Sequence, residues 1–162
     1  MSERCASAAK IRSLAEVRAR VESARAAGRS IALANGVFDL IHVGHVRYLE
    51  AAAAMADVLV VAVNSDASTR ANKGPSRPIV PEDERAELVA ALGCVDHVVL
   101  FEEKSPIGVI RALRPDVQVK GTDYTPDSIP ERAEVESWGG RVAVAGDPKN
   151  HSTTEMVRKL ER

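Results

Sequence analysis

A valine-rich segment, VLVVAVN at residues 58–64, constrains the fold more than any other part of the sequence. Its first six side chains are all apolar, with no alternation of polar and apolar positions. Such a run is typical of a strand in a parallel sheet, because helices then cover both of its faces. Four other short apolar segments are predicted to be strands: residues 31–35, 97–101, 116–120 and 141–146.

Helical patterns lie between these segments. Apolar residues recur at helical spacing from Leu14 to Ala24, which predicts a helix over residues 11–27 that ends at Gly28. Strands alternating with helices predict an α/β fold, a parallel sheet of about five strands with helices on both faces. Residues 67–80 contain two prolines and are predicted to be the longest irregular loop. Further helices are predicted over residues 43–55, from Pro81 to Gly93, from Ser105 with Pro106 in its first turn, and from about Ser152.

The composition excludes several classes of protein. A formal net charge of -1 provides no basic surface field, so we expect no nucleic-acid partner. No apolar run approaches the roughly 20 residues that span a bilayer, so we expect no membrane partner either. Two cysteines, Cys5 and Cys94, fit neither a disulfide framework nor a cysteine-rich zinc site. We therefore expect a cytoplasmic protein.

Polar residues gather where the predicted strands end. In open parallel sheets, ligands bind outside the carboxyl ends of the strands. Residues of this kind come from four separate places in the sequence: Asn35, Gly36, Phe38, Asp39, His42 and His45 after the first strand, Asn64, Ser65 and Asp66 after the second, Lys120, Gly121, Thr122, Asp123 and Tyr124 after the fourth, and His151 to Thr154 after the fifth.

The two histidines of the first group admit three interpretations. They can line a packed turn, or they can bind zinc together with His151, although such a site normally has three or four protein ligands. The third interpretation is phosphate binding, because His42 and His45 flank Gly44 at the predicted start of a helix. Helix N-termini offer free N–H groups and positive potential, and glycine permits a close approach to the backbone. The combination favours phosphate.

The C-terminal sequence HSTTE contains a second run of polar residues before a predicted helix. Ser152 and Glu155 form a capping-box pattern, which stabilises a helix without any ligand. One cap needs one hydroxyl, so Thr153 and Thr154 are left over. Beside the histidine cluster, this run predicts a second phosphate-binding helix end.

The pattern His42-x-Gly44-His45, after Gly36-x-Phe38-Asp39 and before the hydroxyl run, resembles the cytidylyltransferase-like nucleotidyltransferases. Within that family, the blocks VAVNSDAS, KGPSRPIVP, ERAELVAAL, VDHVVLFEE, RPDVQVKGTDY and HSTTEMVRKL resemble the adenylyltransferases that activate D-glycero-β-D-manno-heptose 1-phosphate. The resemblance covers residues 31–160. It implies a Rossmann-like fold, with residues 1–30 as an N-terminal helical segment and residues 31–162 as the nucleotidyltransferase domain.

Two features depart from the pattern of this family. Many members carry the domain behind a sugar kinase, for which 162 residues leave no room, so we expect the stand-alone form. Before the hydroxyl run, Asn150 and His151 replace the usual glycine and small apolar residue. Asparagine tolerates a left-handed backbone, so the turn is expected to persist.

The resemblance implies that AMP passes from ATP to the sugar 1-phosphate and that pyrophosphate is released, with Mg²⁺ accompanying the ATP and no protein metal ligand. It also implies a homodimer. Other roles stay open for Phe38 in the core, for Asp66 as a helix cap and for Arg85 in a pair with Glu82. The implied residues are His42, His45 and Lys73 for catalysis, Gly36, Phe38, Asp39, Gly44, Asp66, Ser152, Thr153 and Thr154 for ATP, and Arg77, Arg85, Lys120, Asp123 and Tyr124 for the sugar phosphate.

Two alternatives remain at this stage. One is a cytidylyltransferase that uses CTP and a small phosphoalcohol such as glycerol 3-phosphate, since base choice in such folds depends on backbone groups. The other is a nucleotide-binding regulatory module without catalysis, against which His42, His45 and Lys73 argue.

Overall fold

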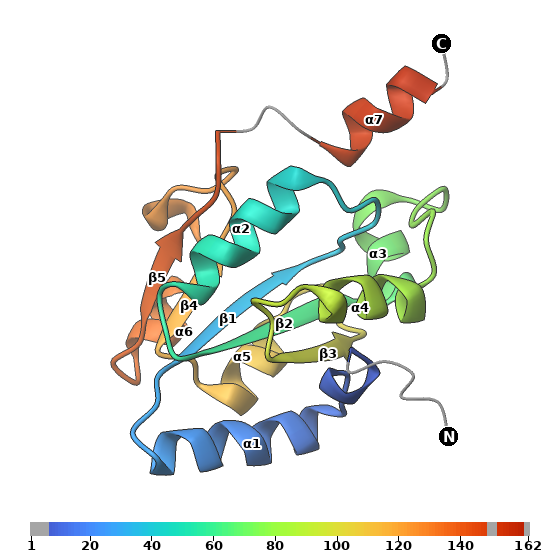
Figure 1. The fold of residues 1–162 in the computed structure, drawn as a ribbon. Coiled ribbons are helices and arrows are strands. Elements are labelled where there is room, and N and C mark those ends of the chain that lie inside the picture. The colour runs from blue at the N-terminus through green and yellow to red at the C-terminus, as the bar shows by residue number, and fades with distance from the viewer. Residues whose placement is uncertain (1–6, 149–151, 161–162) are drawn as a thin grey trace, which may run out of the picture.

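The computed structural model of the chain describes residues 7–148 and 152–160, and its centre is a parallel sheet of five strands (Figure 1). The strand order is β3-β2-β1-β4-β5, and the pairing sets Ile31 beside Val58 and Ala32 beside Val117. The prediction of a parallel α/β sheet is confirmed, with strand ends within two residues of those expected. The strands are β1 Ile31–Gly36, β2 Val58–Asn64, β3 His97–Phe101, β4 Val117–Lys120 and β5 Arg141–Val144.

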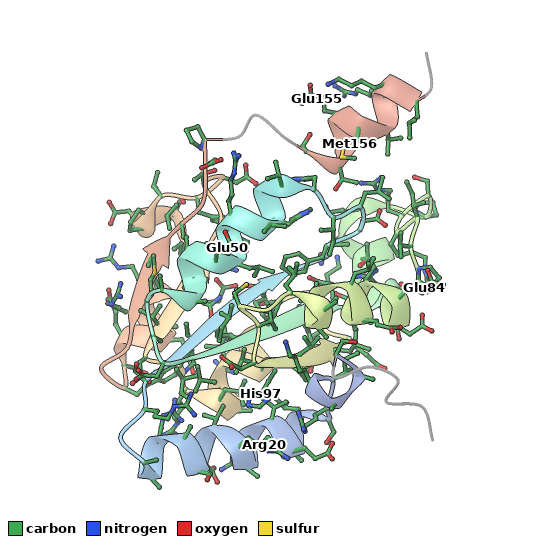
Figure 2. The ribbon with its side chains drawn as sticks, viewed as in Figure 1. Arg20, Glu50, Glu84, His97, Glu155 and Met156 are labelled. Carbon is green, nitrogen blue, oxygen red and sulfur yellow. The ribbon has the colours of Figure 1, made fainter. Side chains whose placement is uncertain are left out.

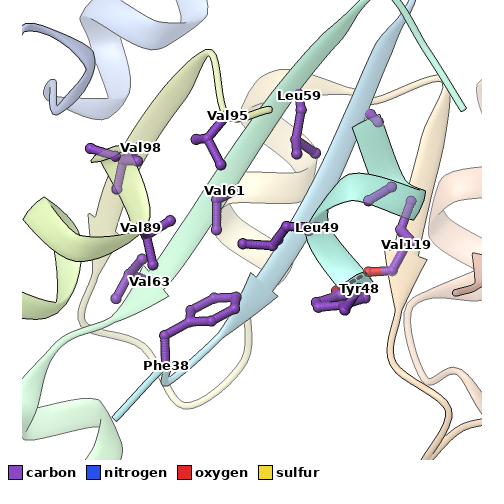
Figure 3. Close-up of a cluster of buried hydrophobic side chains, with 14 of the residues drawn as sticks. Phe38, Tyr48, Leu49, Leu59, Val61, Val63, Val89, Val95, Val98 and Val119 are labelled. Atoms are coloured by element: carbon purple, nitrogen blue, oxygen red, sulfur yellow. Dashed lines mark hydrogen bonds between the residues drawn. The ribbon is translucent and has the colours of Figure 1, made fainter. Parts of the chain in front are cut away.

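Helices cover both faces of this sheet, and each face has its own core. Ala32 and Ala34 of β1 face α2 and α4, whose Leu49 and Val89 lie in the same cluster (Figure 3). The intervening residue Leu33 packs on the other side with α1, α5 and α6. This double coverage explains the unbroken apolar sequence of β2, all of whose residues are buried. The helices are α1 Leu14–Ala26, α2 Val43–Ala53, α3 Asp66–Lys73, α4 Glu82–Ala91, α5 Ile107–Leu113, α6 Arg132–Glu136 and α7 Thr153–Leu160, with short 3₁₀ turns η1 Ala8–Lys10 and η2 Pro126–Ser128.

The N-terminal helix α1 packs on the sheet of its own chain. Its side chains Val17 and Val21 are fully buried in the second core cluster. At its start, the Ser13 hydroxyl accepts the Glu16 backbone N–H, while the Glu16 carboxylate accepts the Ser13 N–H. This capping box fixes where the helix begins, three residues later than expected.

The predicted loop over residues 67–80 is wrong in its first half, where the chain forms α3. The Ser65 hydroxyl accepts the Ser68 N–H and caps the helix, which continues to Gly74 at a φ of 96°. The sequence DASTRANK contains no apolar side chain larger than alanine, so no apolar run marked this segment as a helix. The short helix α6 was not predicted either.

No helix in the described part of the chain has the length and apolarity needed to cross a membrane.

Candidate functional site

Two adjoining cavities open at the carboxyl ends of β1 and β4, where the strand order reverses direction. This is the place at which open α/β sheets bind their ligands. The cavities measure about 230 Å³ and about 650 Å³. Six residues line both of them, so together they form one cleft: His45, Tyr48, Lys73, Gly121, Asp123 and Thr153.

The two histidines stand together at the start of α2. His42 is the N-cap residue and His45 occupies the third helical position. Their rings stack with centroids 4.0 Å apart, and the His45 Nδ1 accepts the His42 backbone N–H at 3.3 Å. Because Nδ1 is the acceptor, the proton of neutral His45 resides on Nε2. The side chain can therefore donate a hydrogen bond into the cleft.

Burial lowers the pKa of His45, and together with the smaller effects of the His42 and Lys73 charges it brings this pKa to about 4. At neutral pH His45 is therefore an uncharged donor. Between pH 6.5 and about 4 the unfolded chain binds a proton that the folded chain does not, so stability decreases as the pH falls through this window.

We expect imidazole NMR signals of His45 in the ligand-free protein to titrate with a midpoint near 4 and to report an Nε2–H tautomer. The variant His45→Asn retains an acceptor for the His42 N–H but does not titrate. Its melting temperature should fall less than that of the parent chain between pH 6.5 and 4. A His45 midpoint near 6.5 would contradict this account.

Lys73 lines both cavities and a third, shallower hollow beside α7. The sequence placed it in a long loop as a mobile cation, whereas the structure has it as the last residue of helix α3. Arg77 and Arg158 share the third hollow with it, next to Thr154. Arg158 belongs to the last turn of α7, so α3, the segment after it and α7 each contribute one cation to this hollow.

The hydroxyl groups at the start of α7 cap the helix and line the cleft. The Ser152 hydroxyl accepts the Glu155 N–H at 3.1 Å, which is the predicted cap. The Thr153 hydroxyl lies 3.4 Å from the Leu40 carbonyl oxygen, to which it donates. Ser152, Thr153 and Thr154 all line the smaller cavity opposite His42. The structure therefore brings together the two helix ends that the sequence paired.

Tyr48 and Gly146 complete the wall of the smaller cavity, and sequence reasoning missed both. The buried Tyr48 hydroxyl donates to the Val119 carbonyl at 2.7 Å and ties α2 to β4. Gly146 has a φ of 103°, and an added Cβ would lie 3.4 Å from the Cα of Tyr48. Glycine lets the segment after β5 pass close to α2. The signal for Gly146 was a glycine as the final residue of the last predicted strand, residues 141–146.

The ring of Phe38 packs against His45, and Gly36 lies next to the same ring. Phe38 is 3 % exposed, packs in the first core cluster, and its ring centroid lies 5.3 Å from that of His45. A Cβ on Gly36 would come within 3.1 Å of the Phe38 ring, so a larger residue at this position would press on that ring. Both residues line the larger cavity. The alternative role of Phe38 in the core is thus realised, and its contact with ATP stays a prediction.

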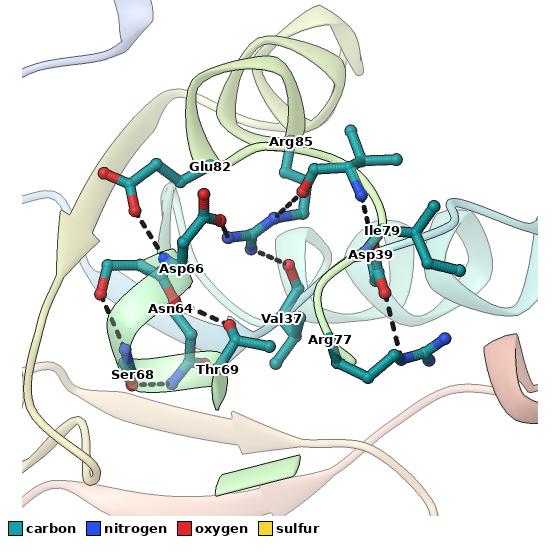
Figure 4. Close-up of polar contacts among 12 residues, drawn as sticks. Val37, Asp39, Asn64, Asp66, Ser68, Thr69, Arg77, Ile79, Glu82 and Arg85 are labelled. Carbon is teal, nitrogen blue, oxygen red and sulfur yellow. Dashed lines mark hydrogen bonds and ion pairs between the residues drawn. The ribbon is translucent and has the colours of Figure 1, made fainter. Parts of the chain in front are cut away.

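Asp39 is buried beneath the segment that follows α3 (Figure 4). Its Oδ1 accepts the backbone N–H groups of Ile79 at 2.8 Å and Val80 at 2.9 Å. Its Oδ2 lies 3.3 Å from the Arg77 Nε. Asp39 therefore holds this segment against the cleft, and the same ion pair occupies Arg77, which was expected to bind the sugar phosphate.

Arg85 lies outside the cleft, which corrects its predicted role as a substrate ligand. The side chain is 0 % exposed and donates to the carbonyls of Val80 and Val37 and to Asp66 Oδ1, the last at 2.8 Å (Figure 4). Its donors are engaged within the protein, so none is offered to a substrate. Asp66 is held in this ion pair and lines neither cavity of the cleft. The alternative pair with Glu82 does not form either, because Glu82 accepts the Asp66 N–H.

The remaining predicted substrate residues lie at the β4 side of the cleft. Lys120 Nζ donates to Asn35 Oδ1 at 3.0 Å, and it lies 5.3 Å from the centroid of the Tyr124 ring. Asp123 lines both cavities, and Asp147 lines the smaller one. Asp147 is already paired with Arg47. Mg²⁺ was expected to enter with ATP without a protein ligand, and this stays a prediction.

Residues 7–148 and 152–160 contain no group of three or more histidine, cysteine, aspartate or glutamate side chains placed to hold a metal ion. His151, considered above as a third zinc ligand, lies outside the described residues, as do Lys149 and Asn150.

Comparison with known proteins agrees with this geometry. The model of the family described as cytidylyltransferase-like matches residues 33–159. The chain is 50 % identical over 143 residues to the "Bifunctional protein HldE" of Trichlorobacter lovleyi, covering 88 % of this chain and 29 % of that protein. The chain is 52 % identical over 136 residues to the protein of the same name from Acidiphilium cryptum, and this match covers 84 % of this chain and 28 % of that protein. The chain thus spans less than a third of the length of these relatives.

A solved structure, described as a lipopolysaccharide core biosynthesis protein from Thermoplasma volcanium, superimposes with a TM-score of 0.61 at 32 % identity. The match covers 72 % of this chain and 94 % of that one. The sheet order, the paired histidines at a helix start and the match over residues 33–159 all agree with one assignment. The chain belongs to the cytidylyltransferase-like family of nucleotidyltransferases.

Proposed function

We propose that this chain is an adenylyltransferase that transfers AMP from ATP to D-glycero-β-D-manno-heptose 1-phosphate, giving ADP-heptose and pyrophosphate. The observation that carries the proposal is the facing pair of helix ends. His42 and His45 start α2, and the hydroxyl run starts α7 across the smaller cavity. Such an arrangement suits a polyphosphate chain, since N–H groups and side-chain donors point at it from both sides. The names of the relatives and of the structural neighbour favour a sugar-phosphate acceptor.

In the proposed reaction, a phosphate oxygen of the sugar attacks the α-phosphorus of ATP. A new P–O bond forms while the bond from the α-phosphorus to the bridging oxygen breaks, and pyrophosphate leaves with the bonding electrons. No protein nucleophile is required, so the residues act by orientation and by charge stabilisation. Mg²⁺, when bound with ATP, neutralises phosphate charge and helps to orient the triphosphate.

Each residue of the cleft has a distinct task in this scheme. His45 donates from Nε2 to an oxygen whose negative charge increases in the transition state, and His42 does so beside it. Lys73 lines both cavities, and in this scheme it would contact the α-phosphate between the attacking sugar phosphate and the leaving pyrophosphate. Arg158, in the last turn of α7, shares the third hollow with Lys73 and Thr154 and would balance the charge of the leaving pyrophosphate.

Pyrophosphate release tests the proposal directly. We expect the purified chain to release pyrophosphate with ATP and heptose 1-phosphate in the presence of Mg²⁺, and far more slowly when CTP or glycerol 3-phosphate replaces either substrate. Activity confined to CTP and glycerol 3-phosphate would support the cytidylyltransferase alternative. Binding of ATP without turnover on any acceptor would favour the regulatory module.

A further inference from the structure

The larger cavity ends at a cluster of polar side chains that the proposed phosphate chemistry does not use. We call Asn35, Gln118, Lys120 and Glu131 the polar cluster. Asn35 lies in β1, Gln118 and Lys120 in β4, and Glu131 immediately before α6. Asn35, Lys120 and Glu131 line the cavity, and so do His45 and Lys73. One ligand can therefore contact the polar cluster as well as His45 and Lys73.

Hydrogen bonds connect the side chains of the cluster, but two of its buried oxygen atoms have no hydrogen-bond partner. Asn35 Oδ1 accepts from Gln118 Nε2 and from Lys120 Nζ, each at 3.0 Å. Glu131 Oε2 lies 3.4 Å from Lys120 Nζ, which is a long ion pair. Within the described part of the chain, Glu131 Oε2 and Gln118 Oε1 are buried and accept no hydrogen bond.

Burial of the two charged side chains, Lys120 and Glu131, costs free energy of folding when no ligand completes their hydrogen bonds. Lys120 is 5 % exposed and Glu131 6 %. Burial lowers the pKa of Lys120, and the neighbouring Glu131 carboxylate opposes that shift. A buried ion pair repays its desolvation only when the geometry is good and the remaining lone pairs are satisfied, and here they are not. Buried polar groups without partners are rare in native proteins. Glu131 lines the cavity, whereas Gln118 does not, so a ligand in the cavity can supply the missing bond of Glu131.

The charges of the cluster indicate which chemical groups complete it. A phosphate placed here would be repelled by the Glu131 carboxylate, even though Lys120 attracts it. A hydroxyl group satisfies both side chains, because it donates to the carboxylate and accepts from the ammonium group. The cluster thus suits a sugar ring, and this replaces the expectation that Lys120 binds the sugar's phosphate.

Two sugar rings enter the reaction, the ribose of ATP and the acceptor. A ribose at the cluster would bring adenine beside it, and a base needs an apolar surface on which to stack. The neighbouring aromatic ring, Tyr124, already has the Lys120 ammonium group 5.3 Å from its centroid. The acceptor carries many hydroxyl groups and no base, so it matches the cluster better.

We propose that Glu131 is a specificity-determining residue that accepts hydrogen bonds from hydroxyl groups of the acceptor sugar, with Lys120 as its positioning partner. The inference rests on the proposed function, and it assigns Glu131 and Lys120 to recognition of the sugar hydroxyl groups. A site built around a substrate hydroxyl discriminates strongly against an analogue that lacks it, because the buried polar group then stays unpaired.

Steady-state kinetics of Glu131→Gln test this inference. The amide keeps the shape but removes the charge that strengthens the hydrogen bond. We expect the KM for heptose 1-phosphate to rise about tenfold, with little change in kcat or in the KM for ATP. Glu134→Gln is the matched control, because Glu134 lies on α6 and pairs with the exposed Arg111 outside the cleft. Its kinetic constants should equal those of the parent chain.

Monodeoxy analogues of the sugar 1-phosphate sharpen the test. In the parent chain, at least one analogue should show a KM about tenfold above that of the full sugar, and in Glu131→Gln that difference should largely disappear. If Glu131→Gln fails to fold, the variant Lys120→Gln/Glu131→Gln removes both charges together and should show the same loss of discrimination.

Two results would overturn the inference. One is an unchanged KM for the sugar in every folded variant, and the other is a rise confined to the KM for ATP, which would place the ribose at the cluster. A parent chain that turns over no sugar 1-phosphate is a separate outcome. It would refute the proposed function itself, before any variant is compared.

Discussion

Replacing His45 with alanine is expected to lower kcat by about a hundredfold or more, while the KM for ATP changes much less. The neutral imidazole donates from Nε2 because its Nδ1 accepts the His42 N–H, and it faces the cleft at the junction of both cavities. A donor aimed at charge that develops in the transition state contributes on the order of 3 kcal/mol to catalysis. The same change at His42 should act in the same direction. Single-turnover and steady-state pyrophosphate assays measure both.

His97→Ala is the matched control for this experiment. His97 is also a partly buried histidine with a lowered pKa, caused by burial. It begins β3, at the amino ends of the strands, well away from α7 and its Glu155 and Met156 (Figure 2). Its loss should leave kcat unaltered. If His45→Ala retained the turnover of His97→Ala, the role of His45 would be restricted to capping α2.

Replacing Arg85 with methionine should destabilise the fold by about 3–5 kcal/mol, although Arg85 contacts neither cavity of the cleft. The guanidinium joins three segments through Val37, Val80 and Asp66. Its removal leaves two carbonyl oxygens and a carboxylate without their donor. For a chain of this size the melting temperature should fall by roughly 10 °C. Urea titration and thermal melts provide the measurement.

Arg111→Met supplies the comparison for Arg85. Arg111 makes two hydrogen bonds to Glu134, so it also loses an arginine–carboxylate pair. This pair is exposed to solvent, where such interactions contribute at most about 1 kcal/mol. Equal melting temperatures for Arg85→Met and Arg111→Met would mean that burial of Arg85 adds nothing to stability, contrary to our interpretation.

Local sequence was sufficient to predict the sheet and the meeting of two helix ends at one cavity. The run VLVVAVN has no polar position because β2 is covered on both faces, and that pattern is visible without coordinates. His42, His45 and the hydroxyl run lie next to strand ends, so the rule for parallel sheets brought them together correctly. The helix α3 was not predicted because its sequence contains no apolar side chain larger than alanine, and because its Ser65 cap was not recognised.

The roles of the charged residues were decided by tertiary structure. Arg85 and Lys120 are both cations near predicted strand or helix ends, and nothing in the sequence separates them. In the fold, Arg85 is enclosed by Val37, Val80 and Asp66, while Lys120 faces the cavity beside Glu131. The partners of a long side chain come from segments far apart along the chain, and only their packing brings them together. Sequence by itself therefore determined the architecture and which helix ends meet at the cleft, whereas the tertiary structure alone decided which charges are enclosed within the protein and which line the cleft.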